Sequence, residues 1–127
     1  MERKIKVVIK KVGEEPEVRE IESNLRTLQE LVSGHIESVY FDMDLDSHGI
    51  FAYGNENAKL EHQDCNFWLY NKEDVFCGTA VFCKDNGMGE EDSLTDEDIE
   101  VIKKFLEKSK MTESEQEFAN YVIRRNF

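Results

Sequence analysis

The sequence predicts a single α+β domain: a mixed, mainly antiparallel sheet of about five strands, a crossover helix on one face, and two C-terminal helices. Three observations support this prediction. The chain has 127 residues, a length that suits one domain with its own core. Segments with the patterns of strands recur up to residue 83. Two segments with the spacing of amphipathic helices, each preceded by a threonine cap, follow at the end.

The N-terminal segment is typical of a β-hairpin. Residues 4–11 (KIKVVIKK) alternate apolar and basic side chains, so we expect a half-buried strand whose lysines face water. Flanking lysines also suit an edge strand, where charge discourages pairing with other chains. We expect a turn at residues 13–16, and then a short strand marked by Val18 and Ile21 that pairs with the first.

Residues 16–41 form the unit around which we expect the rest of the chain to be organised. Asn24 is placed to cap a helix, and apolar residues follow it at helical spacing up to residue 32. Gly34 is expected to end this helix in the left-handed conformation, and residues 36–41 to form a third strand. If the second and third strands run parallel, the helix is a right-handed crossover between them.

The middle of the chain gives weaker signals. Residues 42–49 predict a loop or a fraying strand end, and residues 50–53 a fourth strand. Residues 58–71 predict a long loop with one helical turn. Residues 75–83 (VFCGTAVFC) are apolar on both faces, which is typical of a central strand. Gly78 within this segment marks a bulge or a close backbone approach.

The C-terminal segment predicts two helices. Thr95 begins the first with a capping-box pattern and acidic residues in its first turn. Thr112 repeats the cap and begins a last helix. Because no linker splits the chain, we expect one domain over residues 1–127, with a core at 1–108 and an added helix at 109–127.

The charge balance argues against several classes of partner. Lys and Arg number 16 and Asp and Glu 28, which gives a formal net charge of -12 at pH 7. Because phosphate neutralisation requires clustered Lys and Arg, we expect no direct binding to nucleic acid or to an anionic membrane. We recognise no signal peptide and no apolar run near the ~20 residues of a membrane span. The three cysteines are an odd number, so we expect reduced thiols in a cytoplasmic protein.

Acidic side chains mark a first candidate surface, for docking of a partner. Asp42, Asp44 and Asp46 alternate; in an extended segment they lie about 7 Å apart along one side, close to the charge spacing of a phosphate backbone. The same pattern opens a calcium loop, but Ser47 and Tyr53 stand where that loop needs Gly and Glu, so we expect no calcium site. A solvated loop and ordinary helix-start chemistry are the alternatives. The predicted partner-binding residues are Asp42, Asp44, Asp46, Glu90, Glu91 and Asp92.

Polar residues near the central strand mark a second candidate, a pocket for a small molecule. Trp68, Tyr53 or Tyr70 would supply a wall on which a planar ligand stacks. The alternative is turn chemistry, since Asn55 directly after Gly54 suits a turn without any ligand. The predicted pocket residues are Asn55, Glu56, Asn66, Trp68 and Thr79.

Cysteine and histidine side chains give no coherent catalytic or metal site. His62, Cys65, Cys77 and Cys83 supply four nominal zinc ligands, but their spacing departs from the tight pairs of structural zinc sites. A Cys65 nucleophile with His62 or His48 as its base has no local signature. We therefore expect core thiols, no metal, no cofactor and no enzymatic activity.

Five short motifs occur in one order along the chain. They are PEVREI (16–21), LQELVSGHIE (28–37), NENAKL (55–60), CGTA (77–80) and SLTDEDI (93–99). Together they resemble a family of small domain-of-unknown-function proteins from bacteriophages, plasmids and other bacterial mobile elements. The resemblance implies a mobile-element accessory protein in a bacterial cytoplasm. It does not imply an activity, since it supplies no established catalytic residues to carry over. Two features depart from the family: EHQDCNFW (61–68) replaces a proline-containing segment, and the helix after Thr112 is an addition.

These observations lead to two hypotheses. The first is a non-enzymatic phage or mobile-element protein that binds a host protein through an acidic surface in counter-defence, as an inhibitor or a nucleic-acid mimic. The second is a protein that sequesters a small nucleotide-like signal in the predicted pocket. A homodimer is a further open alternative, since Phe118, Tyr121 and Phe127 can either cover the core or meet a second subunit.

Overall fold

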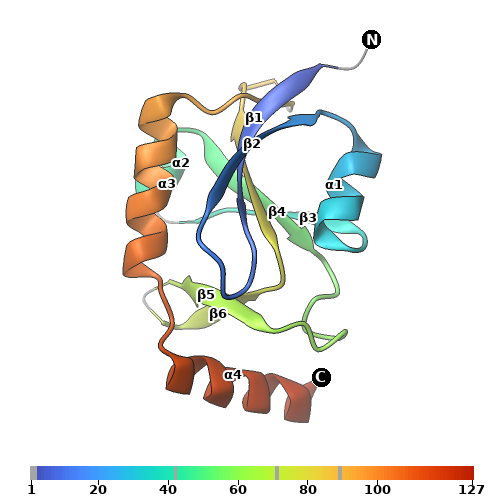
Figure 1. The fold of residues 1–127 in the computed structure, drawn as a ribbon, viewed down its shortest axis with the longest axis vertical. Coiled ribbons are helices and arrows are strands. Elements are labelled where there is room, and N and C mark those ends of the chain that lie inside the picture. Colours follow the sequence, from blue (N-terminus) through green and yellow to red (C-terminus); the bar gives the residue numbers. More distant parts are fainter. Residues whose placement is uncertain (1–2, 42, 71, 89) are drawn as a thin grey trace.

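The computed structural model describes residues 3–41, 43–70, 72–88 and 90–127 and confirms the predicted α+β class (Figure 1). The strands are β1 (Lys4–Lys10), β2 (Glu17–Glu22), β3 (Ile36–Val39), β4 (Ile50–Asn55), β5 (Cys65–Leu69), β6 (Asp74–Cys77), β7 (Ala80–Asp85) and β8 (Glu91–Asp92). The helices are α1 (Leu25–Val32), α2 (Met43–Ser47), α3 (Asp96–Lys108) and α4 (Glu113–Asn126).

The main sheet has the strand order β2-β1-β7-β4-β3, and β8 extends it by pairing with the end of β7. Each pair of neighbouring strands is antiparallel. It follows that β2 and β3 run in the same direction, but they lie at opposite edges rather than side by side. α1 therefore carries the chain from one edge of the sheet to the other. A separate two-stranded sheet is formed by β5 and β6.

The expected edge position of the first strand is wrong, because β1 lies between β2 and β7. Its lysines are accommodated by glutamates of β2, since Lys4 stands opposite Glu22 and Lys6 opposite Glu20. Opposite charges facing each other across a strand pair stabilise the pairing. The sequence pattern of flanking lysines thus reflects a charged partner strand and not an unpaired edge.

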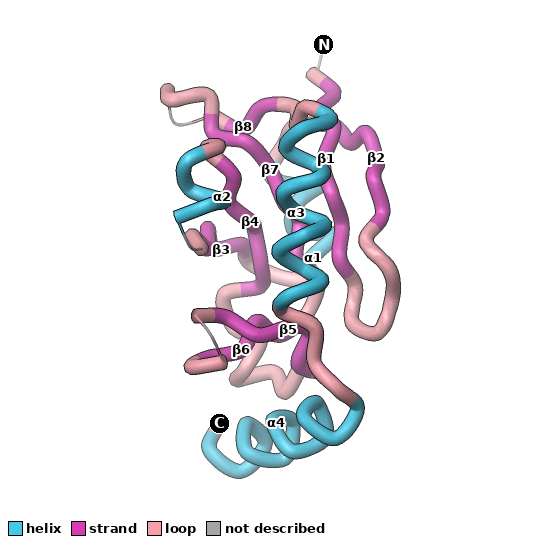
Figure 2. The backbone as a smooth tube through the Cα atoms, turned by 90° about the vertical axis from the view of Figure 1, so that its left-hand side faces the viewer, coloured by secondary structure: helices cyan, strands magenta, loops and turns pink. Residues whose placement is uncertain are grey.

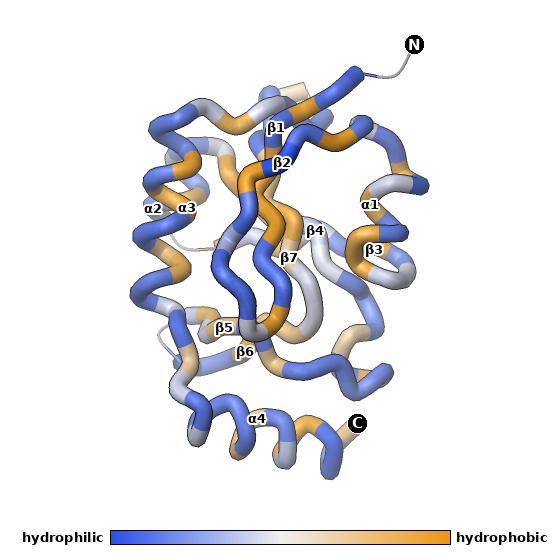
Figure 3. Tube along the Cα trace, viewed as in Figure 1, coloured by the Kyte–Doolittle hydropathy of each residue, from blue (hydrophilic) through white to orange (hydrophobic). Residues whose placement is uncertain are grey.

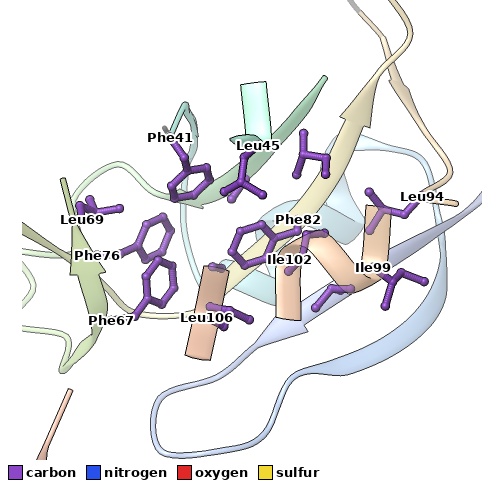
Figure 4. Close-up of a cluster of buried hydrophobic side chains, with 14 residues drawn as sticks. Phe41, Leu45, Phe67, Leu69, Phe76, Phe82, Leu94, Ile99, Ile102 and Leu106 are labelled. Carbon is purple, nitrogen blue, oxygen red and sulfur yellow. The ribbon is translucent and has the colours of Figure 1, made fainter. Parts of the chain in front are cut away.

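The main sheet is buried on both faces, with α1 on one side and α2 and α3 on the other (Figures 1 and 2). Apolar residues concentrate along the central strands between these layers (Figure 3). The cluster under α1 includes Ile5, Leu28, Val32, Phe51 and Val81. The cluster on the other face, which the small sheet also joins, includes Phe67, Phe76, Phe82, Ile102 and Leu106 (Figure 4). Full burial of one such side chain contributes roughly 1.5–3 kcal/mol.

The ends of α1 show where a local prediction succeeds and where one fails. The Asn24 cap is confirmed, because its side-chain oxygen accepts a hydrogen bond from the Thr27 N–H at 2.8 Å. The left-handed residue after the helix is Ser33, with φ of 60°, and not Gly34. Gly34 is needed for another reason: a Cβ on it would lie 2.6 Å from Nδ2 of Asn55.

Three predictions for the middle of the chain are wrong. Residues 43–47 form α2 instead of a loop, and residues 65–69 form the strand β5 instead of part of a long loop. The segment at 75–83 is two strands, β6 and β7, which belong to different sheets. The break falls at Gly78, whose φ of +77° and crowding by the Gln63 side chain both favour glycine.

Both C-terminal helices begin at the predicted threonines, each with a complete capping box. α4 packs on the small sheet through Ile123 and Ala119. Its outer face leaves Phe118 69% and Tyr121 55% exposed, so a contact with a second subunit stays a prediction. No helix within the described ranges combines the length and apolar character that crossing a membrane would require.

Candidate functional site

The predicted acidic residues of α2 lie on an exposed surface. Asp44 and Asp46 are exposed, whereas Leu45 between them is fully buried and anchors the helix in the core. Because the segment is helical and not extended, these carboxylates do not have the regular spacing of a phosphate backbone. The geometric basis for nucleic-acid mimicry is therefore absent here. Asp42 falls outside the described residues.

His48 connects α2 to the start of α3. Its Nδ1 donates a hydrogen bond to the Asp44 carbonyl at 2.9 Å, and its Nε2 lies 3.7 Å from Oε1 of Glu97. The bond to the Asp44 carbonyl and the nearby Glu97 carboxylate raise the pKa of His48 above its ordinary value. Asp96 and Glu97 are both exposed in the first turn of α3. The acidic start of α3 therefore lies beside α2.

The loop between β7 and β8 adds a third acidic segment at this end of the sheet. The Asp85 N–H donates to the Gly49 carbonyl at 2.8 Å, which fixes the end of β7 next to the residue that precedes β4. Asn86 orders the loop, because its Oδ1 accepts from the Met88 N–H at 2.7 Å. Glu90 is exposed, and its carboxylate accepts a 3.5 Å hydrogen bond from the neutral Asn86 amide.

Glu91 and Asp92, the other predicted partner-binding residues of this segment, are engaged within the fold. The Glu91 carboxylate accepts hydrogen bonds from the Ser23 hydroxyl at 2.7 Å and the Tyr53 hydroxyl at 3.3 Å. The Arg3 guanidinium donates to the Glu91 carbonyl and lies 4.0 Å from the Asp92 carboxylate. Burial and the Glu91 charge raise the pKa of Tyr53. Both acids thus tie β8 to neighbouring strands.

We use the name acidic end for Asp44, Asp46, Glu90, Asp96 and Glu97. All five are exposed, and within the described ranges none forms an ion pair with Lys or Arg. The sequence alone assigned Asp96 and Glu97 to helix-start chemistry. No spacing rule could have placed them beside α2, because only the packing of α2 against α3 brings the two segments together.

Asp98, the next acid of α3, has a structural role. It is buried, and its Oδ2 accepts from the Thr95 N–H at 2.8 Å and from the Lys84 ammonium at 3.0 Å. Burial alone would raise the pKa of Asp98, but the bonds from Thr95 and Lys84 outweigh burial, so the net pKa is lowered. Lys84 is consequently occupied by Asp98 and does not neutralise the acidic end.

Asn55 and Glu56, two of the predicted pocket residues, line one hollow of about 340 Å³ with Tyr70. Glu56 is exposed there, but Asn55 is only 4% exposed and serves the backbone. Its Nδ2 donates to the carbonyls of Ser33 at 3.1 Å and Val32 at 3.3 Å. A ligand could bond to this amide only by displacing those carbonyls.

The remaining predicted pocket residues lie elsewhere. Asn66 is buried, and its Nδ2 donates to the carbonyls of Lys10 at 2.8 Å and Gly78 at 2.7 Å. Trp68 lines a different hollow of about 320 Å³, between β5 and the end of α3. Thr79 lies at the break between β6 and β7. The structure therefore does not gather the five residues around one pocket.

Another hollow, with a volume of about 560 Å³, is lined by a group of lysines that the sequence did not indicate. Lys10 comes from β1, Lys103 from α3 and Lys110 from the segment after α3, so only the fold assembles them. The Lys10 ammonium donates to Oδ1 of Asn66 at 3.0 Å. Burial lowers the pKa of Lys10, with partial opposition from two nearby acids. The acidic residues at this hollow are Glu14, Glu15 and Glu107.

The nominal zinc ligands are separated by the fold. Cys83 is buried in the cluster under α1, whereas Cys65 and Cys77 face each other in the small sheet. His62 is exposed, and its ring contacts the Phe127 carbonyl. Across the part of the chain that the structure describes, no three His, Cys, Asp or Glu side chains are grouped to hold a metal ion.

The fold and surface define a small α+β domain with exposed acids on α2 and at the start of α3, and a hollow lined by both lysines and glutamates near the end of α3. Residues 5–108 match the family model of DUF3846, a domain of unknown function. The chain therefore belongs to this family. The match ends at the last residue of α3, so α4 lies beyond it. Searches of curated proteins and of solved structures gave no match.

Proposed function

We propose that this protein is a non-enzymatic accessory protein of a bacteriophage or other mobile element, which binds a basic surface of a host protein through its acidic end. It would act in the bacterial cytoplasm as an inhibitor in counter-defence. The single observation that supports this function is the acidic end, where three segments expose carboxylates that form no ion pair with Lys or Arg in the described residues. The setting rests on the resemblance of the five motifs to proteins of phages and plasmids.

The physical case is electrostatic. A group of unpaired carboxylates, on a chain of net charge -12, produces a negative potential that attracts and orients a basic partner. Such attraction is screened over about 10 Å at 0.1 M salt and about 3 Å at 1 M. Lys84, a cation that could quench this potential from within, is held by the buried Asp98. Lys104 and Lys108 of α3 line one hollow with Asp44, but among the described residues neither forms an ion pair with a carboxylate of the acidic end, so these carboxylates stay open to a partner.

The test is native mass spectrometry of the untagged protein purified gently from its bacterial host at low salt. We expect one co-purifying host protein that dissociates as salt rises. The variant Asp44→Lys/Asp46→Lys should lose that protein, because it reverses two charges of the acidic end. Neither side chain accepts a hydrogen bond within the described residues, so folding should be preserved, which circular dichroism checks.

The matched control is Glu73→Lys/Glu117→Lys, which changes the net charge equally at two exposed positions away from the acidic end. This control should retain the partner. If the acidic-end variant keeps the partner, the acidic end is not the binding surface. If both variants lose the partner equally, binding depends on net charge and not on this surface.

A second candidate function, sequestration of a small anionic molecule, is favoured by the lysine-lined hollow. Its volume of about 560 Å³ lies within the range of small-molecule sites, and Lys10, Lys103 and Lys110 line it. In the same mass spectra, this function predicts a small added mass that survives moderate salt. It also predicts a thermal stabilisation that follows ligand concentration. Lys103→Ala/Lys110→Ala should remove both effects, whereas the acidic-end variant should leave them unchanged.

A further inference from the structure

Two cysteines of the small sheet stand directly opposite each other under α4. Cys65 of β5 pairs with Cys77 of β6, and their Sγ atoms are 3.7 Å apart. The adjacent Gly78 N–H donates to the Asp64 carbonyl at 2.9 Å, which makes Cys65 and Cys77 a non-hydrogen-bonded pair. Side chains approach most closely at such positions of an antiparallel ladder. Side-chain rotation can therefore bring the sulfurs to the ~2.0 Å of a disulfide with little backbone movement.

The two thiols differ in acidity, which assigns them different chemical roles. The two sulfurs share a hydrogen bond in which either thiol can be the donor; with the Cys77 S–H as donor, this bond lowers the pKa of Cys65. The same bond, together with burial, raises the pKa of Cys77. Lys59 and Arg124 further favour the Cys65 thiolate, while burial and Asp64 oppose it. Since the thiolate is the nucleophile in disulfide exchange, Cys65 is the attacking group.

α4 covers this pair and forms hydrogen bonds with the backbone of Cys65. The Cys65 N–H donates to Oδ1 of Asn120 at 2.8 Å, and Nε2 of Gln116 donates to the Cys65 carbonyl at 2.7 Å. Ile123 packs in the same cluster as both cysteines. Cys65 is 0% and Cys77 5% exposed, and Cys77 also lines the hollow of about 340 Å³. Because α4 bonds to Cys65 and shields it, opening of α4 should make the Cys65 sulfur accessible to an oxidant.

We propose that Cys65 and Cys77 form a reversible dithiol–disulfide pair, covered by α4 and oxidised by exchange with a small-molecule disulfide such as glutathione disulfide. The Cys65 thiolate attacks one sulfur of glutathione disulfide, forming a mixed disulfide and releasing one glutathione thiolate. The Cys77 thiol then gives its proton to that thiolate and attacks the Cys65 sulfur, which releases the second glutathione. The cysteine pair loses two electrons and two protons, and glutathione disulfide becomes two thiols. This site is independent of the acidic end.

Cys83 supplies the contrast within the same chain. It is fully buried under α1, and burial raises its pKa. Its sulfur contacts the Val81 carbonyl at 3.7 Å and has no cysteine opposite it. A thiol that only fills the core should remain reduced under conditions that oxidise the Cys65–Cys77 pair.

The experiment incubates the full chain in buffers that range from fully reduced to fully oxidised glutathione, followed by acid quench, thiol counting after denaturation, and intact mass measurement. We expect the free thiols to fall from three to one, with the loss of two hydrogen masses and recovery on addition of dithiothreitol. Cys83→Ser should lose the same two hydrogen masses, with its free thiols falling from two to none. Cys77→Ser should instead accumulate a stable glutathione adduct on Cys65, which identifies the attacking sulfur. If the chain keeps three free thiols in every buffer, the proposal that Cys65 and Cys77 form a disulfide is wrong.

The role of α4 is tested by the rate of oxidation. Asn120→Ala removes the hydrogen bond to the Cys65 N–H, so α4 should open more often and oxidation should accelerate about fivefold. Glu117→Ala, on an exposed position of α4, is the control and should leave the rate unchanged. Equal rates in both variants would overturn the role of α4 as the cover.

Discussion

Replacement of Asn55 by alanine should lower the free energy of unfolding by about 2–3 kcal/mol. The Asn55 amide donates to the carbonyls of Ser33 at 3.1 Å and Val32 at 3.3 Å, which are unsatisfied groups at the end of α1. Its oxygen accepts from the Asn57 N–H at 2.7 Å. Each hydrogen bond contributes about 1 kcal/mol net, and the partners left behind are partly buried. The loss is therefore a sizeable part of the stability of a small domain.

Gly34 provides an internal check on this geometry. A Cβ at Gly34 would lie 2.6 Å from Nδ2 of Asn55, so Gly34→Ala should cost about 1–3 kcal/mol by overpacking. In the Asn55→Ala background the clash is gone, because alanine has no amide. The double variant should therefore be more stable than the sum of the single effects predicts, by about 1 kcal/mol.

The assay is urea unfolding followed by far-UV circular dichroism, with linear extrapolation to water. Asn57→Ala is the matched control, because within the described residues its side chain makes no hydrogen bond and only its N–H is used. A change below about 0.5 kcal/mol for Asn55→Ala, the usual range for surface substitutions, would refute the structural role of this amide. Strict additivity of the Asn55 and Gly34 substitutions would refute the close contact.

Two further predictions concern charged groups of α3 and its neighbours. Asp98→Asn should destabilise the protein by about 2–3 kcal/mol at pH 7 and Asp96→Asn by less than about 0.5, measured by urea unfolding. The folded pKa of Asp98 is lowered from 3.8, so the stability that its carboxylate contributes is present above 3.8 and is lost as the pH falls through the folded pKa. In acid, the free energies of unfolding of Asp98→Asn, Asp96→Asn and the wild type should therefore converge. His48 should titrate above its ordinary pKa of 6.5 by NMR, so its stabilising effect is present below 6.5 and is lost as the pH rises through the folded pKa. Glu97→Gln should lower the His48 pKa only in part, since the bond to the Asp44 carbonyl remains; an unchanged pKa would contradict the contact.

Element ends could be predicted where a contact within three residues decides them. Asn24, Thr95 and Thr112 each accept a hydrogen bond from an N–H three positions later, and the sequence contains both partners. The end of α1 could not be predicted in the same way. There Gly34 must be small because the Asn55 side chain, 21 positions later in the sequence, packs against it. The residue in the left-handed conformation is Ser33.

The candidate site was predictable only in part, because tertiary packing decides which acids are free. The sequence indicated Asp44 and Glu91 alike as surface acids. In the fold, Glu91 bonds to Ser23 and Tyr53, while Asp44 stays exposed. β5 escaped prediction because its partner strand is β6 in a small separate sheet, with one further bridge from Phe67 to Lys110. Its buried side chains are divided between two clusters, since Phe67 and Leu69 pack with residues of α3 and Cys65 packs with Ile123 of α4.

The polar groups that the fold already uses indicate where a partner can bind without loss of stability. A ligand that takes the amides of Asn55 or Asn66 must first displace backbone carbonyls, at about 1 kcal/mol for each bond lost. Among the side-chain hydrogen bonds of the described residues, a partner that contacts Asp44, Asp46 or Glu90 breaks only the weak Asn86 contact. Variants at Asp44, Asp46 or Glu90 should therefore alter binding and leave unfolding unchanged, whereas variants of the buried amides should alter both. That separation distinguishes a binding surface from residues that hold the fold together.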